Sequence, residues 1–219
     1  MKKNTSKVRL NLLSKPAFEI FGELGKITPE GVLGGGTAIM LLLAHRRSFD
    51  LDVFLTRPIP KNLLTRLKSY YQSRLSAVIG DTEEELSVIV SKKTKLSFIY
   101  FPFPPLYKTV SSQSISLFSR EDLASNKAYV IGRRGLFRDY VDLFFLLKSG
   151  LPLAKVINDA QKRFGGTFGD KLFLEQLTYW EDLNDFTVEF IGKAYQRDQI
   201  QKYFEKQVRA YLESKVKTA

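Results

Sequence analysis

The residues with the clearest chemical potential are a glycine-rich turn and two aspartates that follow it. Residues 34–55 read GGGTAIMLLLAHRRSFDLDVFL, so Asp50 and Asp52 lie two positions apart. A glycine turn that opens a helix offers backbone N–H groups to an anion such as a phosphate. On a strand, residues two apart project from one face, and neighbouring carboxylates repel unless a cation lies between them. The pattern therefore predicts Mg²⁺, or Mn²⁺, held by both aspartates for phosphoryl or nucleotidyl transfer.

The elements that must hold these residues follow from periodicity. Strict alternation over 48–55 predicts a strand, and the apolar segment 37–45 predicts a buried helix opened by glycine and threonine. We expect His45 to be structural and to cap the C-terminus of that helix, where partial positive charge is favourable. Further elements are expected before residue 119: a helix over 15–26, a short strand at 32–33, a helix over 58–75, and a hairpin of strands 86–90 and 95–101.

The second half of the chain has a different pattern. A proline- and serine-rich stretch over about 102–119 ends the strand pattern, and everything after it has helical periodicity. Helices are expected over residues 121–131, 137–148, 153–164, 170–183 and about 190–214. The sequence therefore predicts an α+β fold, with a small mixed sheet and helices over residues 1–119 and a C-terminal helical bundle over residues 120–219.

Composition excludes several kinds of site. The chain of 219 residues has no cysteine and one histidine, which removes disulfides, Cys-ligated zinc and any mechanism that needs two imidazoles. A bound metal should then be a hard cation with oxygen ligands. The longest apolar run, 38–44, is too short to cross a membrane, so we expect a cytoplasmic protein. The net charge of +11 is spread along the chain and fits either a phosphate-rich partner or simple solubility.

A second motif lies in the helical half: Lys127-Ala128, then Arg133-Arg134-Gly135, then Arg138-Asp139-Tyr140-Val141-Asp142-Leu143. The chain resembles the nucleotidyltransferase superfamily related to DNA polymerase β in the order of its motifs: the Gly-Gly-Thr-Ala turn, Arg-x-Ser, Asp-x-Asp and then this second motif. The sequence of residues 35–54, GGTAIMLLLAHRRSFDLDVF, is similar to the AbiEii/AbiGii toxin nucleotidyltransferases of prokaryotic toxin–antitoxin and phage-resistance systems. The resemblance covers about residues 31–148 and implies a polymerase-β-like nucleotidyltransferase core.

Each candidate residue has an expected role. The nucleotide-binding set is Gly35, Gly36, Thr37, Arg46, Ser48 and Lys127, and the metal ligands are Asp50 and Asp52. Arg46 would reach a phosphate oxygen or lock the entry to the strand, and Lys127 would meet the triphosphate from the helical side. Asp139 and Asp142 lie three apart on a helix, hence on nearly one face. The resemblance implies that both are functional but does not say which one deprotonates the attacking hydroxyl.

One position departs from the wider superfamily. Many members carry a third carboxylate on a following strand, where this chain has Ser97. Either Asp139 or Asp142 substitutes for it, or the metal site is reduced, or the protein binds a nucleotide without turning it over.

These features predict a Mg²⁺-dependent enzyme that moves a nucleoside monophosphate from a nucleoside triphosphate onto an acceptor hydroxyl, with loss of pyrophosphate. The resemblance implies an RNA acceptor such as a tRNA 3′ end, growth arrest as the outcome, and a cognate antitoxin as partner. Two alternatives stay open. One is a catalytically silent nucleotide- or RNA-binding module, and the other is an enzyme that modifies a small molecule or a protein hydroxyl.

Overall fold

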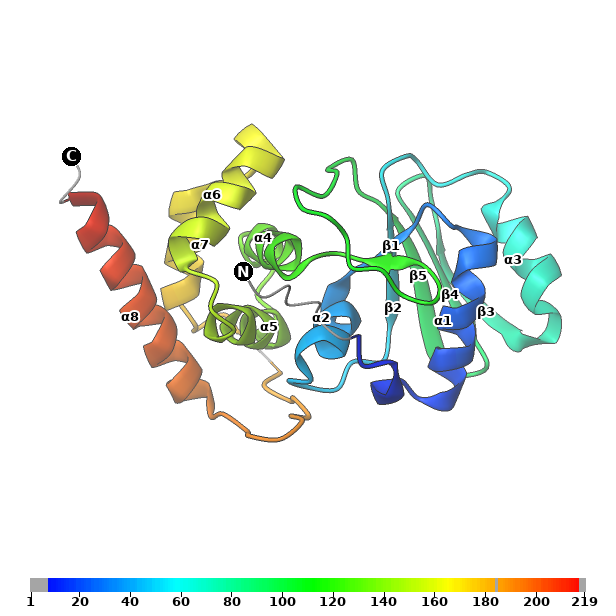
Figure 1. Cartoon of the computed structure of the whole chain (residues 1–219), viewed down its shortest axis with the longest axis horizontal. Coiled ribbons are helices and arrows are strands. Elements are labelled where there is room, and N and C mark those ends of the chain that lie inside the picture. The colour runs from blue at the N-terminus through cyan, green and yellow to red at the C-terminus, as the bar shows by residue number, and fades with distance from the viewer. Residues whose placement is uncertain (1–7, 184, 217–219) are drawn as a thin grey trace. The chain divides into compact units, whose positions relative to one another are not determined.

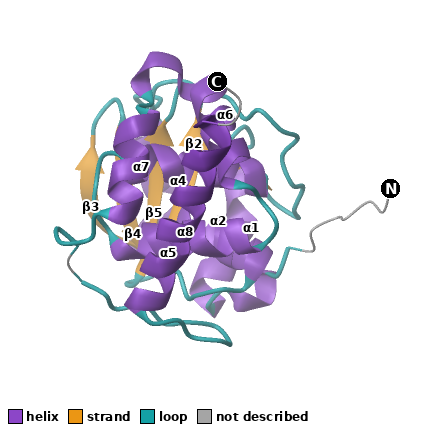
Figure 2. Ribbon diagram, turned by 90° about the vertical axis from the view of Figure 1, so that its left-hand side faces the viewer, coloured by secondary structure: helices purple, strands orange, loops and turns teal. Residues whose placement is uncertain are grey.

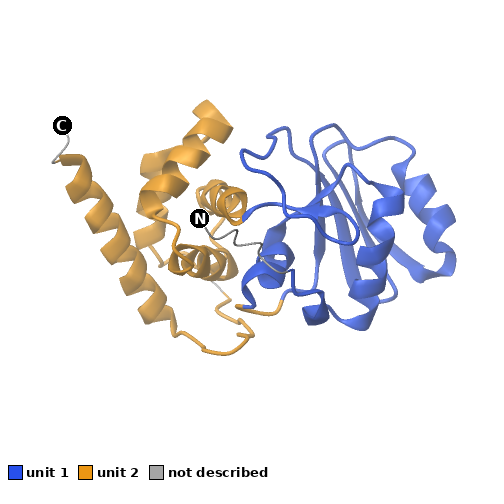
Figure 3. Cartoon of the chain, viewed as in Figure 1, with its two compact units in different colours: residues 1–44, 48–119 blue, residues 45–47, 120–219 orange. Residues whose placement is uncertain are grey.

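The computed structural model describes residues 8–183 and 185–216, and the chain divides into two compact units (Figure 3). Unit 1 comprises Met1–Ala44 and Ser48–Ser119, and unit 2 comprises His45–Arg47 and Arg120–Ala219. The main division therefore falls after Ser119, but three residues from the first half are part of the second unit. None of the helices in the described ranges combines the length and hydropathy that crossing a bilayer requires.

Unit 1 is built on a six-stranded mixed sheet in the order β3-β4-β5-β2-β1-β6 (Figures 1 and 2). Its strands are β1 (Val32–Leu33), β2 (Leu51–Leu55), β3 (Leu75–Asp81), β4 (Glu85–Val90), β5 (Thr94–Tyr100) and β6 (Ser116–Leu117). The central strand β2 is parallel to β5 and antiparallel to β1, while β3, β4 and β5 form an antiparallel meander. Three helices complete the unit: α1 (Lys15–Ile27), α2 (Gly35–Leu43) and α3 (Leu63–Tyr71).

The two faces of β2 have different environments. Leu51, Val53 and Leu55 are buried on one face, whereas Asp52 and Phe54, on the other, are half-buried. Because side chains alternate along a strand, burial of the three apolar residues fixes the face on which Asp52 projects. The core of unit 1 thus determines the orientation of a candidate site residue.

Unit 2 is helical, with a buried aromatic core. Its helices are α4 (Arg120–Ile131), α5 (Phe137–Lys148), α6 (Leu153–Phe164), α7 (Asp170–Thr178) and α8 (Arg197–Val216). In the core, the ring of Tyr140 on α5 lies 5.1 Å from that of Trp180 and 6.2 Å from that of Phe204 on α8, both edge to face. Such contacts add to the free energy that burial of the rings contributes.

Most of the expected elements are present. Helices over 15–27, 137–148 and 153–164, the short strand at 32–33 and the hairpin of β4 and β5 agree with the sequence predictions to within a residue or two. The predicted helix over 37–45 is α2, which begins and ends two residues earlier. The predicted strand over 48–55 begins only at Leu51, and Phe49 is 62% exposed.

Three predicted elements were wrong in extent. The helix expected over 58–75 spans only Leu63–Tyr71, and after a 3₁₀ turn the chain enters β3, which was not predicted. The helix expected to end at residue 183 ends at Thr178, and the last helix begins at Arg197 rather than near 190. In the first case the ladder with β4 determines the structure, and tertiary pairing overrides local periodicity.

Candidate active site

The glycine turn and Asp52 meet at the N-terminus of α2. Gly34 is the N-cap of this helix, and its N–H donates to the Asp52 carbonyl at 2.9 Å. Gly35 has φ +64°, a conformation that favours glycine, and a Cβ added there would overlap the Asp52 carboxylate. Gly35 is therefore required both by its backbone conformation and by the close approach of Asp52.

The start of α2 has the properties of an anion site. The N–H groups of Gly35, Gly36 and Thr37 belong to the first helical turn, which has no carbonyl partners within the helix. The helix dipole adds partial positive charge at the same point. A phosphate bound here would lie near the Asp52 carboxylate, and a divalent cation between the two anions would offset their repulsion.

Thr37 and Ser48 brace the segment that carries Asp50. The buried Thr37 Oγ1 donates to the backbone carbonyl of Asp50 and lies 3.0 Å from Ser48 Oγ, and the Ser48 N–H donates to Met40 Sδ at 3.3 Å. The two hydroxyls thus fix residues 48–50 against α2. Asp50 itself lies just before β2 and is exposed.

The donor set of unit 1 fits a hard cation. The described residues contain no group of three or more His, Cys, Asp or Glu side chains arranged to hold a metal. Mg²⁺ in nucleotide-dependent enzymes is commonly held by one or two carboxylates together with substrate phosphates, so a dedicated protein cage is not required. Asp50 and Asp52 would supply carboxylate oxygens of this kind.

Ser97 occupies the position next to Asp52 across the parallel pair of β2 and β5. It is 1% exposed, and its Oγ lies 2.8 Å from that of Ser87 on β4, which in turn donates to Glu85 Oε1 at 2.5 Å. The expected departure from a third carboxylate is therefore accompanied by a hydrogen-bonded pair of serines. Neither Ser87 nor Glu85 was predicted as a site residue.

In unit 2, three basic side chains converge on Asp142, which is fully buried. Its Oδ1 accepts from His45 Nε2 and from Arg46 Nε, each at 2.7 Å. Its Oδ2 accepts from Arg46 Nη2 at 2.8 Å and lies 2.6 Å from Lys127 Nζ. Both carboxylate oxygens of Asp142, on α5, are thus engaged by donors from helix α4 and from the short 45–47 segment.

Lys127 also links Asp142 to Asp139. Its Nζ donates to Asp139 Oδ1 at 2.6 Å, and Arg134 Nε donates to the other oxygen of Asp139 at 3.1 Å. With Arg46, the cluster holds three permanent cations against two carboxylates. Lys127, Asp139 and Asp142 of the second motif are therefore brought together in unit 2.

Burial and the neighbouring charges shift the pKa values of this cluster in opposite directions. Burial raises the pKa of Asp142, but Lys127, Arg46 and a hydrogen bond from His45 outweigh burial and hold it well below its usual range. In the same way the pKa of Asp139 is lowered by Lys127 and Arg134 despite burial. Burial lowers the pKa of Lys127, yet the two carboxylates bring it above its ordinary value. The ion pairs are therefore charged at neutral pH.

His45 does not cap α2, so that prediction was wrong. The C-cap of α2 is Ala44, whose left-handed backbone turns the chain out of the helix, and the imidazole of His45 is bonded to Asp142. Burial lowers the pKa of His45, and the favourable effect of Asp142 does not compensate. Since Asp142 is ionised, Nε2 must carry the proton of a neutral imidazole. No local signal in the sequence indicates this long-range pair.

Arg46 is held by contacts within unit 2. Besides both oxygens of Asp142, its guanidinium donates to the Arg47 carbonyl at 2.8 Å. The bidentate pair locks the segment that leads to β2. Arg134, which bonds to Asp139, was not predicted as a site residue, although it lies within the motif that contains Lys127 and Asp139.

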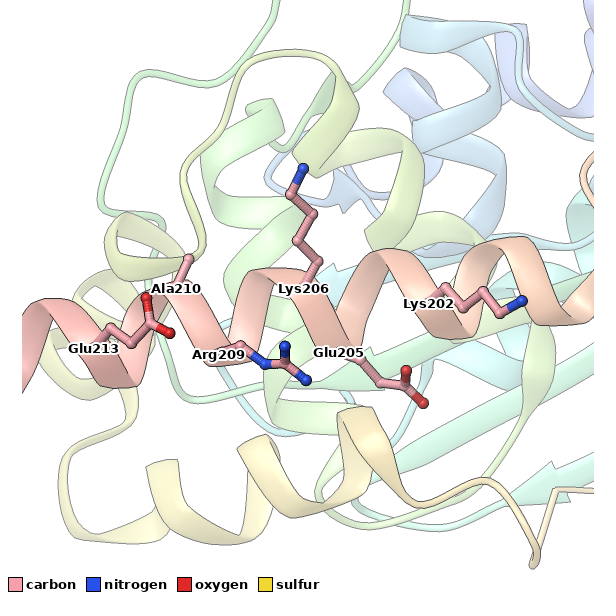
Figure 4. A pocket seen from close by; sticks show the side chains of 6 residues that line it. All are labelled: Lys202, Glu205, Lys206, Arg209, Ala210 and Glu213. Carbon is pink, nitrogen blue, oxygen red and sulfur yellow. The ribbon is translucent and has the colours of Figure 1, made fainter.

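Two surface hollows of the described residues are lined by side chains outside the candidate site. A hollow of about 540 Å³ runs along one helix, α8, and is lined by Lys202, Glu205, Lys206, Arg209, Ala210 and Glu213 (Figure 4). Its mixed charges are typical of a solvated helix face. A second hollow, of about 430 Å³, lies at the end of β2 and includes Leu55, Arg57 and Glu30.

Comparison with known proteins places the fold. No protein-family model matches the chain. An uncharacterised protein of Aquifex aeolicus is 26% identical over 220 residues, covering 94% of this chain and 99% of that protein. A Helicobacter pylori structure described as a candidate nucleotidyltransferase has a TM-score of 0.57 at 20% identity, covering 96% of this chain and 97% of that one.

A second solved structure is similar to the same extent. MenT4, a nucleotidyltransferase toxin of Mycobacterium tuberculosis, has a TM-score of 0.59 at 12% identity, covering 95% of this chain and 88% of its own. At these identities the likeness establishes the fold. The chain therefore has the fold of the nucleotidyltransferases, a mixed sheet followed by a C-terminal helical region.

Proposed function

We propose that the protein is a metal-dependent nucleotidyltransferase that moves a nucleoside monophosphate from a nucleoside triphosphate to an acceptor hydroxyl. The observation that carries this proposal is the contact between the Asp52 carboxylate and Gly35 at the start of α2. It brings a cation ligand to an anion-binding helix terminus, as nucleotidyl transfer requires. Asp50 and Asp52 would hold Mg²⁺ or Mn²⁺, which would neutralise charge on the phosphates.

In unit 2 we propose a division of roles. Asp142 accepts four close contacts, so it acts as a positioning residue that holds His45, Arg46 and Lys127. Lys127 and Asp139 are the proposed members that act on substrate. Removing either side chain should reduce nucleotidyl transfer in a variant that still folds.

We further propose an RNA acceptor, such as a tRNA 3′ end, and a role as an AbiEii-type toxin with a cognate antitoxin, in the cytoplasm. The net charge of +11 supports a polyanionic partner. The shared fold with MenT4, whose name describes a nucleotidyltransferase toxin, supports the biological role.

The direct test is transfer of label from each of the four α-labelled nucleoside triphosphates to total RNA, with Mg²⁺ or Mn²⁺. We expect RNA labelling and pyrophosphate release by the wild type, and loss of both in Asp52→Asn and Asp50→Asn. Asp81→Asn is the matched control, because Asp81 is an exposed aspartate at the end of β3 in the same unit. Wild-type protein that labels nothing with any triphosphate would contradict the proposal.

Ser97 favours a second candidate, a silent nucleotide-binding module. A buried serine in place of a third carboxylate provides no base of its own. Calorimetry would then show triphosphate binding by the wild type without any transfer to RNA, small molecules or protein. Transfer that depends on Asp52 would exclude this candidate.

A further inference from the structure

A short chain of hydrogen bonds crosses the sheet beside Asp52. Ser87 on β4 faces Ser97 on β5, and Ser97 faces Asp52 on β2, so the three residues lie side by side across neighbouring strands. Ser87 Oγ donates to Glu85 Oε1 at 2.5 Å, and the two serine Oγ atoms lie 2.8 Å apart. The chain therefore runs from an exposed carboxylate to the neighbour of the candidate metal ligand.

The direction of this chain follows from counting protons. An ionised carboxylate only accepts, so the single hydroxyl proton of Ser87 points to Glu85. Ser87 Oγ can then only accept from Ser97, whose own proton is directed toward β4. The lone pairs of Ser97 Oγ are left for the opposite side, where β2 and Asp52 lie.

This orientation has an electrostatic consequence. A serine beside a carboxylate ordinarily donates to it, which satisfies both groups. Here Ser97 is buried and its proton is committed elsewhere, so two acceptors, its Oγ and the Asp52 carboxylate, share one neighbourhood. Such a pair of oxygens favours a cation between them.

We propose that Ser97 Oγ is a neutral oxygen ligand of the cation that Asp50 and Asp52 hold. Ser87 and Glu85 are positioning residues, which keep the Ser97 lone pairs toward that cation. This inference rests on the function proposed above, because it concerns the same cation. Ser97 keeps its proton throughout, so the proposal involves ligation alone.

The test is the affinity of the full-length protein for Mn²⁺ alone, measured by calorimetry. Ser97→Ala removes the ligand, and we expect the affinity to fall at least about tenfold, the lower end of the effect of altering ligand support at metal sites. Glu85→Ala frees the Ser87 proton, lets Ser97 turn toward Asp52, and should weaken binding similarly. Glu84→Ala is the matched control, since it removes an equal charge from the neighbouring exposed residue and should bind Mn²⁺ as the wild type does.

Two further variants separate positioning from general effects of charge or folding. Glu85→Gln keeps an acceptor oxygen for Ser87, so it should retain most of the Mn²⁺ affinity that Glu85→Ala loses. Ser97→Asp supplies a carboxylate that needs no orientation, so adding Glu85→Ala to it should leave Mn²⁺ affinity unchanged. Because Glu85 is exposed, its variants test the idea even if Ser97→Ala does not fold.

Three results would overturn the inference: wild-type protein that binds no Mn²⁺, Ser97→Ala that binds it within twofold of the wild type, or Glu85→Ala that matches Glu84→Ala. The label-transfer assay decides the proposed function independently. RNA labelling that depends on Asp52 in a protein whose Ser97→Ala variant binds Mn²⁺ normally would leave the function standing and remove Ser97 as a ligand.

Discussion

The chain has a single histidine, so the protonation of the buried cluster in unit 2 can be measured without overlap from other imidazoles. His45 is 1% exposed, and its Nε2 lies 2.7 Å from Asp142 Oδ1. Its Nδ1 is buried with no hydrogen-bond partner among the described residues. Burial lowers the pKa of His45, and Asp142 offsets this only in part. Folding therefore disfavours the imidazolium form.

The sign and size of the effect follow from linkage. Because the folded-state pKa of His45 lies below its unfolded value of 6.5, the unfolded chain binds more protons as the pH falls. Stability is fully present above pH 6.5 and is lost below it, by at most about 1.4 kcal/mol per pH unit. Between pH 7.5 and 5.5 the integrated loss has an upper limit of about 1.4 kcal/mol. The lowered pKa values of Asp139 and Asp142 affect stability only at lower pH, below about 4.

The assay is urea unfolding at pH 7.5, 6.5 and 5.5 for the wild type and for His45→Gln, which keeps an amide donor for Asp142. We expect the free energy of unfolding to fall over this range in the wild type and to stay nearly constant in the variant. Titration of the one histidine ring by NMR gives its pKa directly and does not depend on the variant folding. A wild-type profile that is flat over this range, or a histidine pKa at or above 6.5, would refute the reasoning.

Other substitutions test the remaining features. Asp142→Asn leaves Arg46 and Lys127 buried without their shared carboxylate, so the free energy of unfolding in urea should fall by about 3–5 kcal/mol, and a loss below about 1 kcal/mol would contradict this account. Gly35→Ala forces φ +64° on a residue with a Cβ, at about 1–2 kcal/mol, and displaces Asp52, so calorimetry should show weaker Mn²⁺ binding together with the lower stability. Gly22 lies in the exposed middle of α1, where an added Cβ meets nothing within 4 Å. Gly22→Ala should therefore raise the free energy of unfolding by about 1 kcal/mol and the thermal midpoint with it. An unchanged midpoint would count against this interpretation of α1.

The local pattern of apolar residues was sufficient to predict the elements whose buried side chains recur at regular spacing. Helices α5 and α6 match their predicted bounds because their apolar residues recur at helical spacing. Strand β3 was missed because Val78 and Ile79 are both exposed and its register with β4 shifts twice, so it shows no alternation. Its structure depends on pairing with β4, which a local window does not contain.

The candidate site shows the same contrast. The approach of Asp52 to Gly35 was predictable, because a glycine turn and a strand aspartate separated by one helix are expected to meet in this fold. The partners of Asp142 were not, since His45 and Arg46 lie 97 and 96 residues away in the chain. Periodicity also cannot show that Ser97 is bonded to Ser87, which depends on the register of β4 and β5.

Because residues 45–47 belong to unit 2, a gene fragment that encodes only the second half of the chain does not encode the whole of that unit. The backbone passes between the units three times, after Ala44, after Arg47 and after Ser119. A fragment cut at Ser119 would retain five helices but lose the His45 and Arg46 donors to Asp142. Any exchange of the helical half between related proteins must therefore carry a compatible tripeptide from the other half. This constraint disfavours evolution by simple domain shuffling.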